Sequence, residues 1–570
     1  MGYGGGGREM IFDQLLYERP NIGEFEEKVN ELLGKFDSVN SFEEQFKLID
    51  KINSLRNHVL TMLTIAEIRA QLDTSDKKYQ EEQKFINKNW PVYEKVVASY
   101  YERLIRSAFK EQIRQKYGKQ LLNLAEINVN TISSSVIDKL KRENNLISEY
   151  TRLMANAKIE FKGEERNLAQ LDKFVSSPDR MLRKQAIEKK YELLEQYENR
   201  IDELFDSLIQ VRTQIAKELG YNSFVELGYA RLSRIDYGQQ EVADFRKMIL
   251  KYMVPISEKL REKQRNRIGI ENLTYYDEEV RFKTGEAILK GDANWMIEKF
   301  KTIFQQLSDQ PGEIFHLMHE NKYMDLTIKE NKARGAYATY LCNEKIPYIY
   351  ANFNGSRKDV KVLAHEFGHA FQMAIFNQNN NIPEYILPTK EACEISSIAM
   401  EFLIWPYMEE LFGNDAMNYR YSHLEDAIFV MPYRASIDEF QHFIYTNPNL
   451  SLVERKKKWI EIEQKYMPYK TTYNHSYLKK GNFWHQQIHL FKFPFYYIDY
   501  AMAQICALQI WSIAQIDMYT AWNVYMDICK QGGRLSFLDL LDHSGIASPF
   551  KEEAFENMIN SIDTWFSKND

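Results

Sequence analysis

The sequence predicts a mainly α-helical protein with a small β-sheet, and three observations support this fold class. Between Arg19 and about residue 330 the chain carries few of its 14 prolines, and long proline-free tracts of mixed charged and apolar residues are typical of helices. From Val360 onward, the run VKVLAHEFGHAFQMAIF places apolar residues at helical spacing. Just before that run, the apolar pattern changes to one typical of strands.

Length and composition indicate an ordinary globular protein of two or more lobes. A chain of 570 residues is too long for one simple core, and contents of 44% hydrophobic and 27% charged residues are unexceptional. The net charge of −7 argues against nucleic acid and anionic membrane as partners. The four cysteines lack C-x-x-C spacing, which favours free thiols in a reducing, cytoplasmic compartment. The oligomeric state is left open.

The predicted organisation has three parts. Residues 1–9 are glycine-rich and resemble a leader or tag, although a natural flexible terminus fits equally well. Residues 10–175 form an N-terminal helical lobe, and residues 176–570 form a catalytic part. The boundary rests on the polar run 163–166 and on the turn-like Ser176-Ser177-Pro178.

Residues typical of helix starts and helix ends occur at the beginning of the second part. Ser177 suits an N-cap, Pro178 a first turn, and Gly220 a C-terminal stop, so residues 178–219 form one long helix or two with a kink. Ser223 and Glu226 have the spacing of a capping box that opens the next helix.

A β-hairpin is predicted from residues 337–341 and 346–353, joined through 343–345. Pro347 suggests that the second strand lies at a sheet edge, because proline cannot donate a ladder hydrogen bond. Such an edge beside a metal-binding helix would offer backbone groups to an extended peptide. A purely structural hairpin is the alternative.

The helical run from Val360 contains the motif H-E-x-x-H at His365, Glu366 and His369. Residues i and i+4 share one face of a helix, so both imidazoles can reach one metal ion while Glu366 reaches a water on it. Ser356 and Asp359 precede the motif with capping-box spacing. The alternative is a core helix that carries two hydrogen-bonded histidines.

A third metal ligand is required, and the sequence offers several candidates on a second helix. The pattern H-E-x-x-H-x-x-G-x-x-H fails, so a downstream carboxylate is favoured. Small residues around Glu394 would let two helices approach closely, which favours it modestly. The candidates are Glu384, Glu391, Glu394 and Glu401.

These motifs resemble a known family. HEFGH followed by EISSIAME, with Glu394 25 positions after His369, resembles the thimet oligopeptidase superfamily of zinc peptidases. IPYIYANFNGSRKDVKVLAHEFGHAFQ resembles its oligoendopeptidase F branch, which includes bacterial Pz-peptidases. The resemblance runs from about residue 191 to the C-terminus and is strongest in 334–401 and 485–504.

The resemblance implies one Zn²⁺ per chain, held by His365, His369 and Glu394, with Glu366 as general base and Glu401 supporting the ligands. It also implies two helical lobes that enclose a deep channel for short peptides, and substrate pairing near residues 350–354.

A second chemical candidate is the stretch WHQQIHLFKFPFYYIDYAMAQ, residues 484–504. A tetrahedral oxyanion needs a hydrogen-bond donor beside the metal, and His or Tyr can donate. The resemblance assigns this role to His489, Tyr497 and Tyr500. Family relatives with a glycine-rich loop have Tyr where this chain has Phe493, and Pro494 follows without a Gly-Gly pair. Polar residues interrupt residues 496–516, which predicts a buried core helix rather than a membrane span.

The predicted function is therefore a zinc-dependent endopeptidase that hydrolyses internal bonds of short unstructured oligopeptides. Glu366 would take a proton from the zinc-activated water and deliver it to the leaving amine. The alternatives are a zinc carboxypeptidase and a non-catalytic helical peptide-binding protein.

Overall fold

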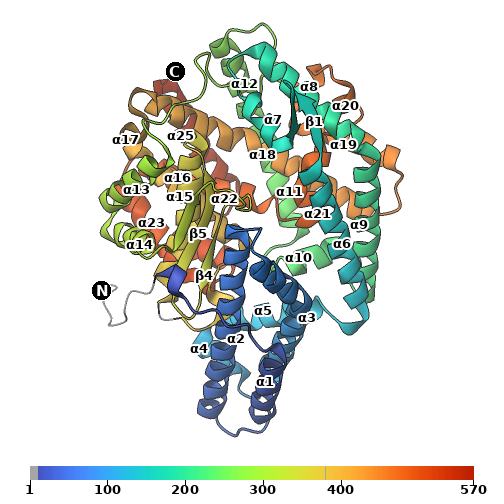
Figure 1. The fold of residues 1–570 in the computed structure, drawn as a ribbon, viewed down its shortest axis with the longest axis vertical. Coiled ribbons are helices and arrows are strands. Elements are labelled where there is room, and N and C mark those ends of the chain that lie inside the picture. The colour runs from blue at the N-terminus through green and yellow to red at the C-terminus, as the bar shows by residue number, and fades with distance from the viewer. Residues whose placement is uncertain (1–10, 379, 570) are drawn as a thin grey trace. The chain divides into compact units, whose positions relative to one another are not determined.

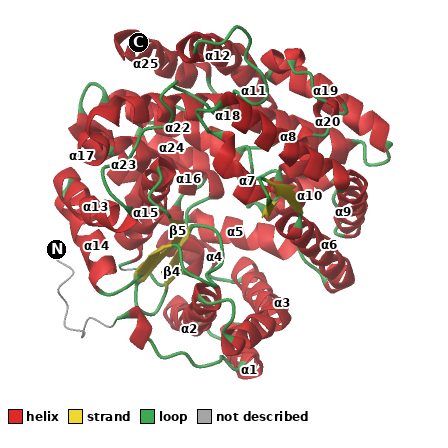
Figure 2. Ribbon diagram, turned by 45° about the horizontal axis from the view of Figure 1, so that its top comes forward, coloured by secondary structure: helices red, strands yellow, loops and turns green. Residues whose placement is uncertain are grey.

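The computed structural model describes residues 11–378 and 380–569, and Figure 1 shows its fold. The predicted leader or tag at residues 1–9 lies outside the described residues. Helices dominate and the strands are few, as Figure 2 shows, so the predicted mainly α-helical fold class is confirmed.

The chain divides into two compact units that interleave along the sequence. Of the described residues, unit 1 contains 11–129, 288–378, 380–414 and 506–546, and unit 2 contains 130–287, 415–505 and 547–569. The sequence instead predicts a single boundary, between residues 175 and 176, and that boundary stays a prediction.

Unit 1 contains the H-E-x-x-H motif and is mainly helical. Its helices are α1 (Ile22–Phe36), α2 (Phe42–Leu72), α3 (Lys77–Arg106), α4 (Lys110–Tyr117), α5 (Lys119–Asn130), α13 (Ala293–Leu307), α14 (Asp309–Glu320), α15 (Arg357–Asn377), α16 (Lys390–Leu403), α17 (Met408–Phe412), most of α22 (Asp499–Ala514), α23 (Met518–Gln531) and α24 (Phe537–Ser544). Short 3-10 turns of this unit are η1 (Phe12–Gln14), η4 (Pro383–Tyr385), η5 (Trp405–Tyr407), most of η6 (Gly413–Asp415) and η9 (Gly532–Arg534).

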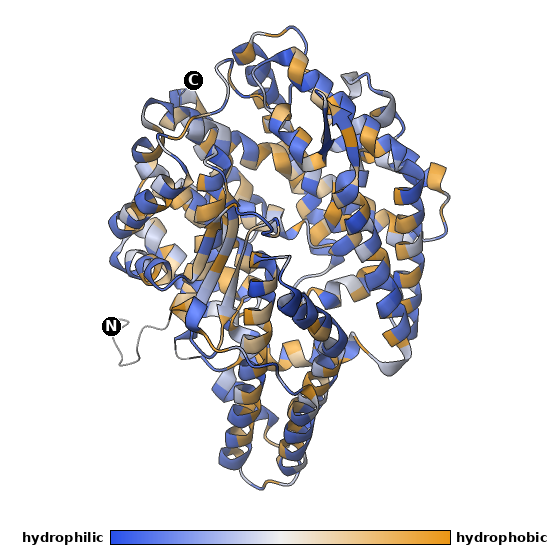
Figure 3. Ribbon diagram, viewed as in Figure 1, coloured by the Kyte–Doolittle hydropathy of each residue, from blue (hydrophilic) through white to orange (hydrophobic). Residues whose placement is uncertain are grey.

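The first three helices pack around a shared apolar core. Val29 of α1, Ile52 of α2 and Tyr100 of α3 are buried in one cluster. Figure 3 shows hydrophobic and hydrophilic residues alternating along these helices, the pattern of helices that bury one face.

A three-stranded sheet lies beside α15 in unit 1, with strand order β3-β5-β4. The strands are β3 (Met324–Thr327), β4 (Tyr337–Leu341) and β5 (Ile346–Phe353). The predicted hairpin is confirmed, with β4 antiparallel to β5 and Tyr337 opposite Tyr350.

The prediction of an edge position for the Pro347 strand is wrong. β5 is the central strand, because β3 pairs with it in parallel on its other side. That pairing begins where Met324 meets Ile349, two residues beyond Pro347, so the proline removes no bond from the β3 ladder. The short strand β3 was not predicted from the sequence, and the sheet edges belong to β3 and β4.

Unit 2 is also helical. Its helices are α6 (Ile137–Asn156), α7 (Leu168–Val175), α8 (Arg180–Gln196), α9 (Glu198–Glu218), α10 (Phe224–Arg231), α11 (Gln239–Met248), the π-helical turn η3 (Ile249–Met253), α12 (Val254–Ile268), α18 (Ala416–Thr446), α19 (Leu452–Tyr466), α20 (Ser476–Lys479), α21 (Ile488–Lys492) and α25 (Glu552–Asn569). Its short 3-10 turns include η2 (Ser134–Val136), η7 (Pro468–Thr472) and η8 (Phe483–Gln486).

Unit 2 also contains a small hairpin that the sequence analysis did not predict. Strands β1 (Lys158–Phe161) and β2 (Glu164–Asn167) pair through a turn in which Lys162 and Gly163 both have positive φ. The polar run 163–166 therefore lies in the turn and second strand of this hairpin.

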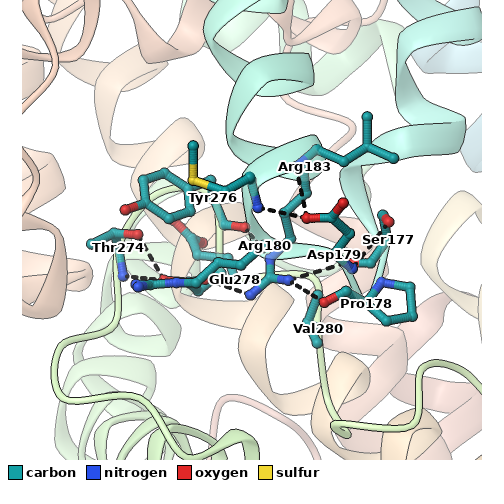
Figure 4. Close-up of polar contacts among 12 residues, drawn as sticks. Ser177, Pro178, Asp179, Arg180, Arg183, Thr274, Tyr276, Glu278 and Val280 are labelled. Atoms are coloured by element: carbon teal, nitrogen blue, oxygen red, sulfur yellow. Dashed lines mark hydrogen bonds and ion pairs between the residues drawn. The ribbon is translucent and has the colours of Figure 1, made fainter.

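The helix signals after residue 176 are partly wrong. Asp179, and not Ser177, is the N-cap of α8, because its carboxylate accepts from the Met181 and Leu182 backbone amides. Figure 4 shows the polar contacts here: the Arg183 guanidinium donates to the Ser177 and Pro178 carbonyls, which keeps both residues outside the helix. The predicted tract is two helices, α8 and α9.

Gly220 follows α9 with a φ of 85°, which matches its predicted role as a helix stop. The next helix does begin after Ser223, yet Ser223 makes no side-chain cap hydrogen bond. The Glu226 carboxylate instead accepts from Asn222, so the predicted capping box is wrong.

All four cysteines are free, as predicted. Cys506 and Cys529 are buried, whereas Cys342 and Cys393 are half-buried. The predicted core helix after residue 496 is α22, whose residues from Ala501 to Ala507 are buried. Within residues 11–378 and 380–569, no helix has both the length and the apolar composition that a bilayer crossing requires.

Candidate metal centre and tyrosine cluster

A polar turn sets the start of helix α15. The Asp359 carboxylate accepts hydrogen bonds from the backbone amides of Asn354, Gly355 and Ser356 at 2.8, 2.7 and 3.0 Å. The Ser356 side chain completes the predicted capping box. These bonds satisfy amides at the helix N-terminus and fix the direction in which the chain leaves the hairpin.

Helices α15 and α16 cross at unusually close range. A Cβ atom added to Gly368 would lie 2.6 Å from the Ser396 carbonyl oxygen and 2.7 Å from the Ser397 Cα. The small residues of α16 therefore do permit close approach, as predicted. The role of Gly368 was not predicted from the sequence, although a glycine inside a helical motif is a signal of close packing.

The close crossing brings His365, His369 and Glu394 into one group. Glu394 Oε2 lies 3.3 Å from His365 Nε2 and 3.6 Å from His369 Nε2. One ligand atom from each residue lies within 4.8 Å of the others. Donor atoms on a tetrahedral zinc ion with bonds near 2.0–2.1 Å are about 3.3 Å apart, so the spacing and the donor types fit Zn²⁺.

Further side chains orient the two imidazoles and the carboxylate. His365 Nδ1 lies 2.7 Å from Glu401 Oε1, and the Ser397 hydroxyl donates to Glu394 Oε2 at 3.0 Å. The Cys393 sulfur lies 3.3 Å from His369 Nδ1. A hydrogen bond at Nδ1 leaves Nε2 as the metal-facing nitrogen, a common arrangement around metal-binding histidines.

Burial and the two carboxylates shift the pKa values of both histidines. Burial lowers the pKa of His365, but hydrogen bonds to Glu394 and Glu401 outweigh it and raise that pKa to about 10. Burial dominates at His369 and lowers its pKa to about 4. The carboxylates of Glu394 and Glu401 therefore place negative charge beside His365, which favours a cation at this position.

Glu366 lies on the same helix but outside the ligand group. Its side chain is buried, and burial raises its pKa to about 7, partly offset by His365 and by a backbone hydrogen bond from Ala338. Ala338 belongs to strand β4, so the sheet holds this carboxyl group directly.

The tertiary structure separates the four candidate glutamates. Glu384 lies outside the group, because its carboxylate binds the buried Arg56 at 2.6 Å and the Tyr101 hydroxyl at 2.7 Å. Glu391 is buried on α16 but is not among the grouped donors. Glu394 lies with the two histidines, and Glu401 lies behind His365.

The other predicted residues form a cluster of their own in unit 2. The His489 ring stacks on Tyr497 at 4.6 Å between centroids and meets Tyr500 edge-on at 6.0 Å. Gln487 Nε2 lies 2.6 Å from His489 Nδ1, so with the amide as donor the imidazole proton sits on Nε2. Burial raises the pKa of Tyr497, although the Arg434 guanidinium lowers it.

His485 and His489 are four positions apart, as are His365 and His369, but they do not form a second pair of metal-binding histidines. It is fully buried, and its ring nitrogens lie 2.9 Å from the Tyr477 hydroxyl and 2.9 Å from Asp202. The two histidines also lie on different short helices, η8 and α21.

Two models of protein families match this chain. The model of peptidase family M3 matches residues 173–559, and the model of the peptidase M3 N-terminal domain matches residues 12–132. The chain belongs to peptidase family M3. This match confirms the resemblance noted in the sequence. It also confirms the prediction that the protein is a peptidase.

Known proteins differ in how closely they match this chain. The solved structure of PZ peptidase A with inhibitor 2 is 46% identical and superposes with a TM-score of 0.92, covering 98% of this chain and 99% of that one. The oligoendopeptidase F homolog of Borreliella burgdorferi is 24% identical over 68% of this chain. Oligopeptidase PepF of Bacillus subtilis is 22% identical over 73% of this chain. The aligned parts span 65% and 63% of those two curated relatives.

Proposed function

We propose that this M3 peptidase is a zinc-dependent endopeptidase that cleaves internal bonds of short, unstructured oligopeptides. The observation that carries the proposal is the spacing of His365, His369 and Glu394, which matches a three-ligand zinc site that leaves one position open. The printed names of its relatives, an oligoendopeptidase F homolog and an oligopeptidase, support oligopeptides as the substrate class.

A zinc ion bound by these residues would supply a Lewis acid that lowers the pKa of a water molecule and polarises the scissile carbonyl. Glu366 takes the proton of the attacking water on its carboxylate and delivers it to the leaving amine nitrogen. Glu401 holds His365 through Nδ1 and keeps its Nε2 directed at the ligand group.

His489, Tyr497 and Tyr500 are proposed as donors to the tetrahedral oxyanion. With Gln487 bonded to Nδ1, His489 presents an Nε2–H donor, and the Tyr500 hydroxyl is a second donor. Removing one such donor typically lowers kcat by about a hundredfold or more.

The test compares wild type, Glu366→Gln and Glu394→Gln. Each protein is analysed for bound zinc, then incubated with a quenched peptide of about ten residues and with a folded protein, and products are mapped by mass spectrometry. We expect one zinc in wild type and Glu366→Gln, little in Glu394→Gln, and internal cleavage of the peptide by wild type alone.

Other outcomes assign other functions. Release of C-terminal residues only would indicate a zinc carboxypeptidase. Peptide binding without turnover by zinc-loaded wild type would indicate a non-catalytic peptide-binding protein. Equal cleavage by Glu366→Gln would remove Glu366 as the base.

A further inference from the structure

The segment that carries the tyrosine cluster has a strained backbone at one residue. Phe495 has a φ of 66°, in the left-handed region that non-glycine residues rarely adopt. Its side chain is fully buried, among the rings of His442 and Tyr445 at 5.0 and 5.6 Å. Such a conformation persists only where the surroundings over-determine it, and it is concentrated at functional sites.

Two buried side chains bind both backbone polar groups of Phe495. Its N–H donates to Gln441 Oε1 at 2.7 Å, and its carbonyl accepts from Arg234 Nη2 at 2.7 Å. Arg234 also pairs with Asp499, the first residue of α22, and neither side chain is exposed. Arg234 therefore ties together the two ends of the turn that contains Tyr497.

The flanks of this turn are held in the same way. On the N-terminal side, the buried Arg212 donates to the carbonyls of Leu490, at 3.1 Å, and Phe491. On the C-terminal side, Arg434 donates to the Tyr500 carbonyl at 3.1 Å, with its guanidinium carbon 5.3 Å from the Tyr500 ring.

Helix α10 closes the other side of the Phe495 ring. A Cβ atom on Gly228 would lie 2.6 Å from Phe495 Cδ2, so only glycine allows this packing. Pro494, directly before Phe495, restricts the backbone further.

We infer that Gln441 and Arg234 are positioning residues for peptide hydrolysis: through the backbone of Phe495 they fix the turn that presents His489, Tyr497 and Tyr500. The turn is a rigid platform, and the oxyanion donors are pre-organised rather than ordered at each turnover. This inference rests on the proposed endopeptidase function, because the cluster has a catalytic role only there.

The decisive variant is Gln441→Leu, which removes the acceptor and keeps similar bulk. Its matched control is Gln264→Leu, because Gln264 is a buried glutamine of unit 2 that also binds backbone, at Asp277, Glu278 and Val280, and these partners lie outside residues 484–504. Both variants lose buried hydrogen bonds, so both should melt at lower temperature.

Activity separates the two variants. We expect Gln441→Leu to lower kcat at 25 °C by about tenfold or more with a smaller change in KM, while Gln264→Leu keeps kcat within about twofold of wild type. Zinc content should equal that of wild type in both, since the ligand group belongs to unit 1.

A double-mutant cycle with Tyr500→Phe tests the route of the effect. If Gln441 acts through the cluster, Gln441→Leu should lower kcat by far less than tenfold in the Tyr500→Phe background, because the effects of coupled sites are not additive. An equal loss in both backgrounds, or an unchanged kcat in Gln441→Leu, would overturn the inference.

Two further arms keep the test decisive. If Gln441→Leu does not fold, Pro494→Gly loosens the same turn at a half-buried position, with the same expected loss of kcat and the same overturning result. If zinc-loaded wild type does not cleave peptides, the proposed endopeptidase function is wrong. If wild type is active and kcat is unchanged in these variants, only the positioning role is wrong.

Discussion

His365 Nδ1 lies 2.7 Å from the Oε1 atom of Glu401, a residue 36 positions further along the chain. Glu401 is almost completely buried, and Lys361 lies 3.6 Å from its other oxygen. The bond fixes the ring orientation of His365, so a residue outside the grouped donors shapes the candidate metal group.

Glu401→Gln should therefore weaken zinc binding without abolishing it. Loss of this carboxylate removes the negative charge behind His365, and such supporting changes typically lower metal affinity by about 10-fold to 100-fold. Competition titration with a zinc chelator measures the change. Glu391→Gln, on the same helix but outside the grouped donors, is the control and should retain wild-type affinity. Equal affinity in wild type and Glu401→Gln would contradict the role.

Gly368→Ala should destabilise the protein and disturb the metal group together. The new methyl would lie 2.6 Å from the Ser396 carbonyl oxygen, so α15 and α16 must separate. Overpacking of this kind costs about 1–3 kcal/mol of unfolding free energy. Urea unfolding and zinc titration should both report a loss.

Gly34→Ala is the matched control for that change, because a Cβ at Gly34 in α1 meets nothing within 4 Å. It should leave zinc affinity unchanged. Gly368→Ala with wild-type stability and zinc affinity would show that the two helices are free to move apart at no cost.

Glu384→Gln should destabilise the fold while leaving the zinc content at the wild-type level. Its carboxylate pairs with Arg56, both side chains are about 4% exposed, and Arg56 lowers the Glu384 pKa against the effect of burial. Breaking a buried pair leaves an uncompensated charge, which costs about 3–5 kcal/mol. Thermal unfolding and metal analysis of the purified variant distinguish this from a ligand role, which would remove the zinc and spare the fold.

The stability of the protein should depend on Glu463 between about pH 4.5 and pH 7. Burial raises the pKa of Glu463 from 4.5 to about 7, and Glu278 adds to this effect, while Lys470 and a hydrogen bond with Trp459 lower that pKa. Across this window the folded state holds a proton that the unfolded state releases, so the contribution of Glu463 to stability falls as pH rises.

Glu463→Gln should remove that contribution to the pH dependence. Its free energy of unfolding, relative to wild type, should rise by on the order of 2 kcal/mol from pH 4.5 to pH 7. Urea unfolding of both proteins at several pH values measures the difference. Parallel pH profiles would show that Glu463 ionises normally in the folded protein.

The sequence alone determined the features that depend on neighbouring residues. The capping box of Ser356 and Asp359, the hairpin before it and the i, i+4 placement of His365 and His369 all follow from local hydrogen bonding and helix geometry. Family resemblance extended this to Glu394, Glu401 and the tyrosine cluster.

Only the tertiary structure decided the features that join distant segments. Local spacing left four glutamates as candidates for the third ligand. The close helix crossing at Gly368 places Glu394 beside the histidines, whereas Glu384 forms an ion pair with Arg56. Pro347 suggested an edge strand, but β3, which lies 20 to 23 residues earlier, pairs with β5 on its other side. The supports of Phe495 come from Arg234 and Gln441, which lie 261 and 54 positions away. The free energy of such contacts depends on burial and on which partners meet in space, and no local pattern encodes either quantity.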